Sequence, residues 1–213
     1  MNARAMILLA SCLACGRLEA GSLNVTVQNA KGAPVSDAVV YATSPSTPVR
    51  AGKQVVLDQQ DKQFVPYVTA VEVGTPVLFP NKDNIRHHVY SLSPAKKFEL
   101  PLYAGTPAKP VVFDNEGFVT LGCNIHDWMI GYLAVVATPY FKVSGANGRV
   151  TLADLPPGNY TVSVWHPLLK GAPQDLAQSV QVGSDTKELH FSLSLKPDFR
   201  AKRAPGVSNG GYP

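Results

Sequence analysis

Short runs rich in Val and Thr recur along the chain, and most of them are bounded by Gly, Pro, Asn or Asp. Apolar and polar residues alternate in Leu23–Val27, which is typical of a strand with one buried face. No stretch of ten or more residues has a convincing helical period, and we expect Pro94–Leu100 to form a helical turn or a loop. The pattern therefore predicts an all-β protein. The expected strands after the first cover 38–41, 55–57, 67–73, 76–79, 88–91, 110–113, 119–123, 132–137, 148–152, 161–165 and 188–195.

Charge excludes one class of function. The formal net charge is +4 at pH 7, and much of it comes from segment 196–213, which has four Lys or Arg against one Asp. The rest of the chain is near neutral, so the sequence has no basic footprint for nucleic acid. We expect residues 196–213 to be a solvated, disordered tail.

The first residues are typical of an export signal. A short basic start is followed by an apolar run of 12 residues, Ala5 to Gly16, which is too short to span a bilayer. Ala20 offers a small residue for cleavage. We therefore expect residues 1–20 to be a signal peptide and the protein to be periplasmic, with no membrane span. A loose match of Leu9–Cys12 to a lipobox leaves a lipoprotein anchor as the alternative.

Removal of the signal changes the meaning of the cysteines. Cys12 and Cys15 lie within it, so the exported protein keeps Cys123 alone. An exported protein with one thiol has no internal disulfide. Coordination as a thiolate would give this exported thiol a use and protect it.

Cys123 belongs to a Cys-x-x-His-x-x-Met segment that also contains His126 and Met129. Soft sulfur ligands combined with imidazole favour copper, and two His, one Cys and a weak axial Met form the type 1 electron-transfer site. The second histidine is available upstream at His87 or His88, and His87 precedes the cysteine by 36 residues. The spacing predicts a mononuclear copper site.

This segment, together with residues 81–89, resembles the blue-copper cupredoxins. In that family the first His follows a strand ending in Asn, and the other ligands cluster on a late loop. The spacing of two residues between His126 and Met129 is most similar to that of amicyanin. The whole stretch, with Asp127-Trp128, also resembles plastocyanin-like methylamine utilization proteins. The resemblance implies a Greek-key cupredoxin β-sandwich with one type 1 copper. The ligands that it implies are His87, Cys123, His126 and Met129.

His87 and His88 are competing candidates for the upstream ligand. Counting from Asn81 places His87 on the ligand position of the cupredoxin pattern. Successive strand residues point to opposite faces, so both cannot readily bind one ion. We favour His87, and expect His88 to order the Cys123 loop through backbone hydrogen bonds and Asn81 to tie the two ligand loops together.

The loop departs from the amicyanin pattern at two positions. Ile125 and Asp127 replace prolines that are common there, and the charge of Asp127 is expected to lower the reduction potential or raise the pKa of His126. The remaining histidines lack metal-ligand spacing. We expect His166 to be packed or hydrogen-bonded and His190 to be exposed.

The pattern of strands and turns changes after Thr138. A strand, a tight turn and a strand over 148–165 resemble the carboxypeptidase regulatory-like, transthyretin-type β-sandwich, and Gly32–Val40 resembles the opening of that module. One division is a cupredoxin region of 22–137 followed by a smaller β region of 138–195. In the other, residues 22–48 complete the region 138–195 around a cupredoxin core of about 50–137. We slightly favour this discontinuous division, because the C-terminal piece alone would struggle to bury a core.

Three classes of function compete. The favoured class is a carrier of single electrons and not an enzyme, because the sequence has no Ser-His-Asp arrangement, phosphate loop or second copper cluster. The resemblance implies a dehydrogenase or cytochrome c as redox partner, and a role in methylamine oxidation. The alternative is a periplasmic copper chaperone or carrier, although three Met in all argue against high-capacity storage. The third is an adhesive or scaffold module with structural copper.

Overall fold

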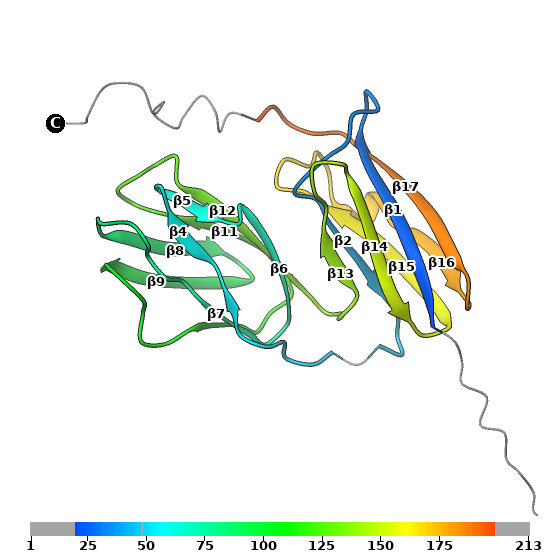
Figure 1. The fold of residues 1–213 in the computed structure, drawn as a ribbon, viewed down its shortest axis with the longest axis horizontal. Coiled ribbons are helices and arrows are strands. Elements are labelled where there is room, and N and C mark those ends of the chain that lie inside the picture. The colour runs from blue at the N-terminus through cyan, green and yellow to red at the C-terminus, as the bar shows by residue number, and fades with distance from the viewer. Residues whose placement is uncertain (1–19, 48, 199–213) are drawn as a thin grey trace, which may run out of the picture.

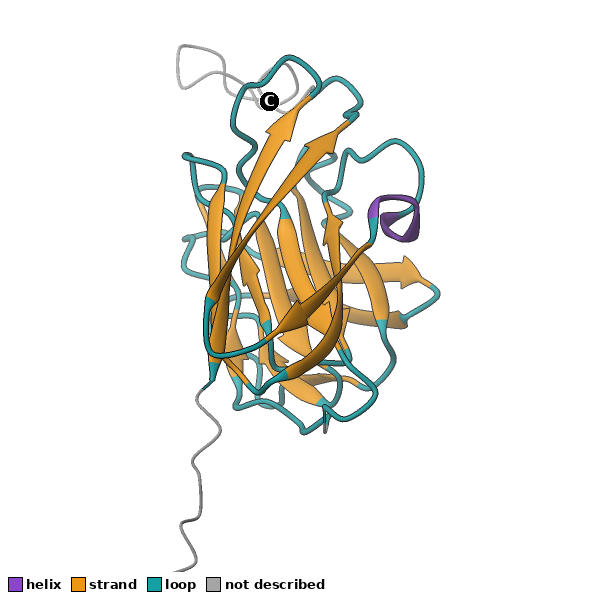
Figure 2. Cartoon of the chain, turned by 90° about the vertical axis from the view of Figure 1, so that its right-hand side faces the viewer, coloured by secondary structure: helices purple, strands orange, loops and turns teal. Residues whose placement is uncertain are grey.

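Strands pack into two β-sandwiches in the computed structural model, which describes residues 20–47 and 49–198 (Figure 1). The described residues contain strands and one short 3₁₀ turn, η1, with no α-helix, so the predicted all-β class is confirmed (Figure 2). The predicted signal, except Ala20, and residues 199–213 of the predicted tail lie outside the described residues. The elements are β1 (Gly21–Asn29), β2 (Val39–Thr43), β3 (Val55–Val56), β4 (Asp58–Gln60), β5 (Gln63–Val65), β6 (Val68–Glu72), β7 (Thr75–Leu78), β8 (His87–Ser93), β9 (Lys96–Tyr103), β10 (Val111–Phe113), β11 (Gly117–Gly122), β12 (Ile130–Val136), β13 (Phe141–Val143), β14 (Arg149–Leu155), β15 (Gly158–Trp165), η1 (Pro173–Leu176), β16 (Gln178–Val182) and β17 (Thr186–Leu193).

The first sandwich contains the predicted copper-ligand segments. Its larger sheet has the strand order β6-β12-β11-β8-β9, and its smaller sheet has the order β10-β7-β3, with the β4–β5 hairpin beside them. Alternating apolar residues of both sheets share one core, as expected for strands that bury one face. Phe79, Phe113, Leu121 and Leu133 are among its fully buried side chains.

The second sandwich is formed by both ends of the described chain. One sheet has the order β14-β1-β17 and the other β13-β2-β15-β16, and their inner faces share a core of their own. β1 lies between β14 and β17, with a parallel pairing to β17, and β2 lies between β13 and β15. The N-terminal strands β1 and β2 thus lie in the same sheets as strands from the C-terminal part of the chain.

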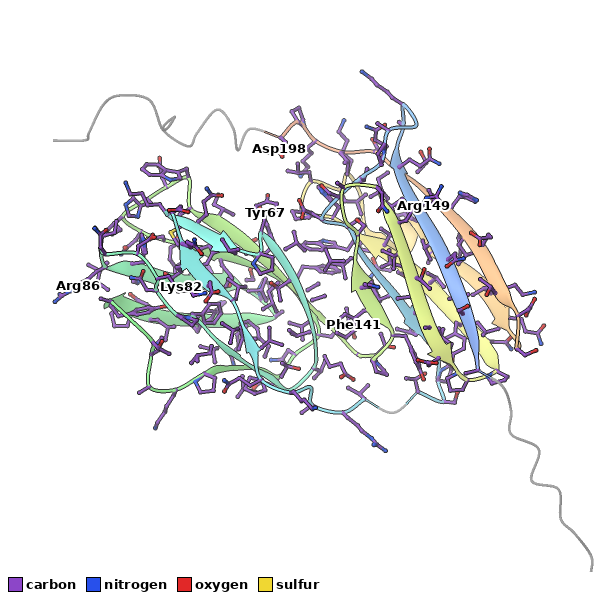
Figure 3. The ribbon with its side chains drawn as sticks, viewed as in Figure 1. Tyr67, Lys82, Arg86, Phe141, Arg149 and Asp198 are labelled. Atoms are coloured by element: carbon purple, nitrogen blue, oxygen red, sulfur yellow. The ribbon has the colours of Figure 1, made fainter. Side chains whose placement is uncertain are left out.

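A third apolar cluster joins the two sandwiches. Trp165 of β15 stacks on Phe118 of β11, with ring centroids 4.4 Å apart and planes within 2° of parallel. Tyr67 and Phe141, which are labelled in Figure 3, belong to the same cluster from opposite sides of the boundary. The contact lies on the side of the first sandwich formed by β6 and β12, and leaves its other end free (Figure 1).

Some elements differ from the sequence-based expectation. Pro94–Leu100 is not a helical turn, because its last five residues belong to strand β9, in which partly buried Phe98 and Leu100 alternate with exposed Lys97 and Glu99. Pairing with β8 stabilises this weak alternation as an edge strand. The β4–β5 hairpin and the strands β13 and β16 were not predicted, since β13 has only three residues and the others are short and rich in polar residues. Within the described part of the chain, no helix is long and apolar enough to cross a bilayer.

Candidate metal centre

Three side chains converge at one end of the first sandwich. His87, Cys123 and His126 each offer one ligand atom, and these atoms lie within 4.8 Å of one another. His87 begins β8, Cys123 directly follows β11, and His126 lies in the loop that leads to β12. The antiparallel pairing of β11 with both β8 and β12 brings the two ligand segments to the same end of the sheet.

His87 has one ring nitrogen without a partner. Its side chain is fully buried, and Nε2 lies 2.6 Å from Oδ2 of Asp83. Nδ1 is also buried, and among the described residues it has no hydrogen-bond partner. An orphaned buried polar atom is costly unless something binds it. Nδ1 is therefore the atom that remains for a metal ion, and His87 fits the predicted ligand role.

Asp83 is held by several donors. Besides the contact with His87, Oδ1 accepts the backbone N–H of Asp61 at 2.7 Å and Oδ2 accepts that of Lys62 at 2.9 Å. Burial acts to raise the pKa of Asp83, but the donors of Lys62, His87 and Asp61 outweigh it and hold the pKa below its usual value. Asp83 lies within the segment singled out from the sequence, yet no spacing rule there indicated its contact with His87.

Cys123 supplies a free thiol in an apolar environment. It is 4% exposed, and it packs in the same core cluster as Val89, Leu121 and Met129. Its Sγ lies 3.8 Å from Nδ1 of His126. A buried thiol beside two imidazoles offers a soft ligand for a metal that also binds nitrogen.

His126 is the partly exposed member of the group. Burial lowers its pKa, the charges of His87 and Lys62 lower it further, and Asp83 opposes them. The expectation that Asp127 would raise the pKa of His126 is therefore wrong, because Asp127 is exposed and its charge is screened by solvent. The indole of Trp128 lies beside the imidazole, with ring centroids 5.2 Å apart.

Met129 closes the loop. Its backbone N–H donates to the carbonyl of His126 at 2.9 Å, which forms a tight turn, and its side chain is fully buried. The thioether belongs to the same apolar cluster as Cys123. The tight turn thus places Met129 three residues after His126, with its side chain in the buried cluster that also contains Cys123.

His88 points away from this group. Its Nε2 contacts Oε1 of Glu99 at 2.7 Å across the β8–β9 pair, and the ring lies beside Tyr90. The expectation that His88 orders the Cys123 loop through the backbone is therefore not met. Asn81 was expected to tie the two ligand loops together, but its side chain contacts its own loop and β9. Nδ2 donates to the carbonyls of Ile85 at 2.8 Å and Tyr103 at 2.9 Å.

The two C-terminal histidines lie in or beside the second sandwich. His166 is buried, and its Nδ1 accepts the backbone N–H of Leu168 at 3.0 Å. His190 is exposed on β17. Both match the expectation, and neither belongs to the metal-ligating group found among the described residues.

Comparison with known proteins gives structural neighbours only. No family model matches this chain, and no curated protein matches it. Among solved structures, the purple cupredoxin of Nitrosopumilus maritimus is 23% identical and covers 40% of this chain and 100% of its own, with a TM-score of 0.34. A reduced amicyanin variant is 24% identical, and the match covers 45% of this chain and 99% of the variant, with a TM-score of 0.36. The Cu-containing nitrite reductase of Thermus scotoductus SA-01 is 21% identical, and the match covers 53% of this chain and 28% of the reductase, with a TM-score of 0.37.

Proposed function

We propose that this chain binds one copper ion through His87, Cys123, His126 and Met129 and carries single electrons between redox partners. The observation that supports the proposal most directly is the convergence of a free buried thiol, a partnerless imidazole nitrogen and a second imidazole within 4.8 Å. Thiolate, imidazole and thioether together are the donor set of a type 1 copper site.

The surrounding protein suits electron transfer. Copper bound here would supply a one-electron couple, Cu(II)/Cu(I). The β-sheet fixes His87 at a strand start and Cys123 at a strand end, so the backbone restrains the ligands. Buried Met129 and its apolar neighbours exclude water on one side of the site. Rigid ligands in a dry pocket reduce rearrangement when the charge of the ion changes.

The same arrangement argues against an enzyme. A copper ion held by all four proposed donors would keep no open position for a substrate, unlike catalytic metal sites, which keep one. Asp83, the carboxylate in contact with the group, already accepts three N–H donors and is not available as a general base. We therefore propose a carrier that performs no substrate chemistry.

His126 offers the route for the electron to leave. It is the partly exposed ligand, and Ile125 beside it is 48% exposed. Arg86, labelled in Figure 3, marks this end of the first sandwich, which faces away from the second sandwich. A small surface of this kind suits a brief redox encounter. We propose a periplasmic dehydrogenase or cytochrome c as the partner, with methylamine oxidation as the process that the sequence resemblance suggests.

Copper loading of the exported protein tests the site. Cu(II) is expected to produce an intense visible band from thiolate-to-copper charge transfer, with one copper bound per chain. Cys123→Ser should abolish the band because it removes the thiolate. His190→Ala, which changes an exposed histidine in the second sandwich, is the control and should keep it. A band that survives in the Cys123→Ser protein would refute the assignment.

Repeated redox cycling separates a carrier from a copper chaperone. A carrier must hold copper in both oxidation states, whereas a chaperone transfers Cu(I) to an acceptor and is recovered empty. We expect the copper content to stay constant through successive rounds of reduction and reoxidation. Progressive loss of metal, or failure to reoxidise, would favour the chaperone.

A further inference from the structure

We propose that Asp83, held by the tip of the β4–β5 hairpin, is a positioning residue that fixes His87 as the Nε2–H tautomer and so presents Nδ1 to the metal. The inference rests on the proposed copper site for its purpose, but its structural content concerns the metal-free chain. It adds a residue that contacts no metal, together with a hairpin whose role the sequence did not suggest.

The contact between Asp83 and His87 is short and sheltered. Nε2 and Oδ2 are 2.6 Å apart, the His87 side chain is fully buried, and the Asp83 side chain is 12% exposed. An ionised carboxylate only accepts hydrogen bonds, so the ring nitrogen facing it must carry the proton. A neutral imidazole has one N–H, which leaves the lone pair on Nδ1. The carboxylate thus selects the tautomer that leaves Nδ1 free for a metal.

The hairpin tip fixes the carboxylate in turn. Asp61 and Lys62 form a two-residue turn between β4 and β5, and both have positive φ angles of 54° and 56°. Such turns usually contain Asn and Gly, because other residues are strained in this region. Here the strained backbone directs two consecutive N–H groups at Asp83, at 2.7 and 2.9 Å. The cost of the turn is offset by the binding of this side chain.

A second set of contacts fixes the loop between Asp83 and His87. The backbone N–H of Asp83 donates to Oδ1 of Asn81 at 3.0 Å, and Asn81 donates to the carbonyls of Ile85 and Tyr103. Asn81 is itself bridged to the backbone of Gln59 and Gly105. Both ends of the Asp83–His87 segment are therefore held by strands, and the carboxylate has little freedom to leave the imidazole.

The charge of Asp83 has a consequence for the metal. A carboxylate bonded to the distal N–H of a ligand histidine increases the electron-donor strength of the other nitrogen. A stronger donor favours the ion of higher charge, so Asp83 should stabilise Cu(II) relative to Cu(I). Its loss should therefore weaken Cu(II) binding more than Cu(I) binding and raise the reduction potential.

The variant that tests this is Asp83→Asn, with Asp61→Asn as its matched control. An amide has one acceptor oxygen for three N–H donors, so Asp83→Asn cannot keep all of these bonds. Asp61→Asn removes the same charge from the hairpin tip, keeps its backbone donor, and places Asn where positive φ is tolerated. We expect Asp83→Asn to lower Cu(II) affinity roughly 10- to 100-fold, the range found for such partners.

The two variants should also differ in potential. Each tenfold loss of Cu(II) affinity relative to Cu(I) raises a one-electron potential by about 59 mV. We expect the reduction potential to rise in Asp83→Asn. In Asp61→Asn the ratio of Cu(II) affinity to Cu(I) affinity should change less than roughly threefold, because a solvated charge is screened. Equal changes in the two variants would show a simple effect of net charge and would overturn the proposal.

A measurement on the metal-free wild-type protein does not depend on whether a variant folds. The ¹⁵N chemical shifts and long-range couplings of the His87 ring, recorded at about pH 8, where an ordinary histidine is neutral, report which nitrogen carries the proton. We expect the Nε2–H form, and finding Nδ1–H would overturn the proposal. If this tautomer is found but Cu(II) gives no blue band, the copper function fails while the role of Asp83 stands.

Discussion

Tyr103 of β9 pairs with His87, the first residue of β8, and its hydroxyl has two hydrogen-bond partners. It donates to the carbonyl of Phe79 at 2.6 Å and accepts from the side chain of Gln59, which is fully buried. The pKa of Tyr103 is raised to about 12, mainly by burial; the Gln59 hydrogen bond lowers it, and the charge of Cys123 acts in the same direction as burial. The protonated form is therefore the one that the fold stabilises.

This raised pKa predicts a loss of stability at high pH. The unfolded chain releases the Tyr103 proton near pH 10, whereas the folded chain keeps it until about pH 12. The unfolded state thus binds fewer protons over this interval, so the free energy of unfolding falls as pH rises through it. Tyr103→Phe should weaken this pH dependence and cost about 1–2 kcal/mol at neutral pH, because two buried polar groups lose a partner.

Urea unfolding of both proteins near neutral pH and between pH 10 and 12 measures these effects. Some decline will persist in the variant, because burial also raises the pKa of Tyr41 and Tyr160. Identical slopes with pH in the two proteins would contradict the assigned role of Tyr103.

Strand β8 decides which of two adjacent histidines faces the metal group. Its residues alternate between two faces, so His87 turns to Cys123 while His88 turns to Glu99. The pairing of β8 with β9 shifts between His87 and Val89, where β9 has an extra residue. Such bulges bend a strand and change the direction of nearby side chains. This bulge lies directly at the proposed ligand.

Alanine substitution at each histidine tests the alternation. His87→Ala should eliminate the blue band and reduce copper binding, because His87 is the upstream histidine that the described residues place within 4.8 Å of the Cys123 and His126 ligand atoms. His88→Ala should keep one copper and the band. The lost contact with Glu99 should lower the free energy of unfolding by less than about 1 kcal/mol, since that carboxylate is 67% exposed. Loss of the blue site in His88→Ala alone would reverse the ligand assignment.

The whole molecule depends on strands far apart in the sequence. β1 and β2 are interior strands of the two sheets in the second sandwich, and Leu23, Val25 and Val27 of β1 are almost completely buried there. The chain leaves the second sandwich after β2 and returns to it beside the same strand. The hydrogen bond from Oγ1 of Thr138 to the carbonyl of Ala42, at 2.6 Å, marks the point of return. The first sandwich is thus an insertion between adjacent points of the second.

This arrangement predicts that residues 138–195 do not fold alone. Without β1 and β2 each sheet is split, and the remaining strands expose their core faces. We expect narrow amide dispersion in the NMR spectrum of this fragment. A chain that joins residues 20–43 to 138–198 through a short Gly-Ser linker should fold, since the two junctions are in contact. A cooperatively folded fragment 138–195 would contradict the discontinuous arrangement.

Local sequence was sufficient for part of the proposed metal centre. Cys123, His126 and Met129 lie within seven residues, so their proximity is set locally and their spacing indicates them as candidate ligands. The all-β class was equally accessible, because alternation with a period of two is a local property. Strand β9 was misread because its alternation is weak and its stability comes from its pairing with β8.

The sequence by itself therefore determined the class of fold, and it supplied the proposed soft donor set and the short list of upstream histidines. Only the tertiary structure decided which face of β8 each histidine takes, because that depends on the pairing with β9. It alone revealed that Asp83 binds His87 and is held by Asp61 and Lys62, residues more than 20 positions earlier in the chain. It also decided that β1 and β2 belong with the C-terminal strands. These contacts join segments distant in sequence, and no local pattern of residues encodes which distant backbone groups will meet.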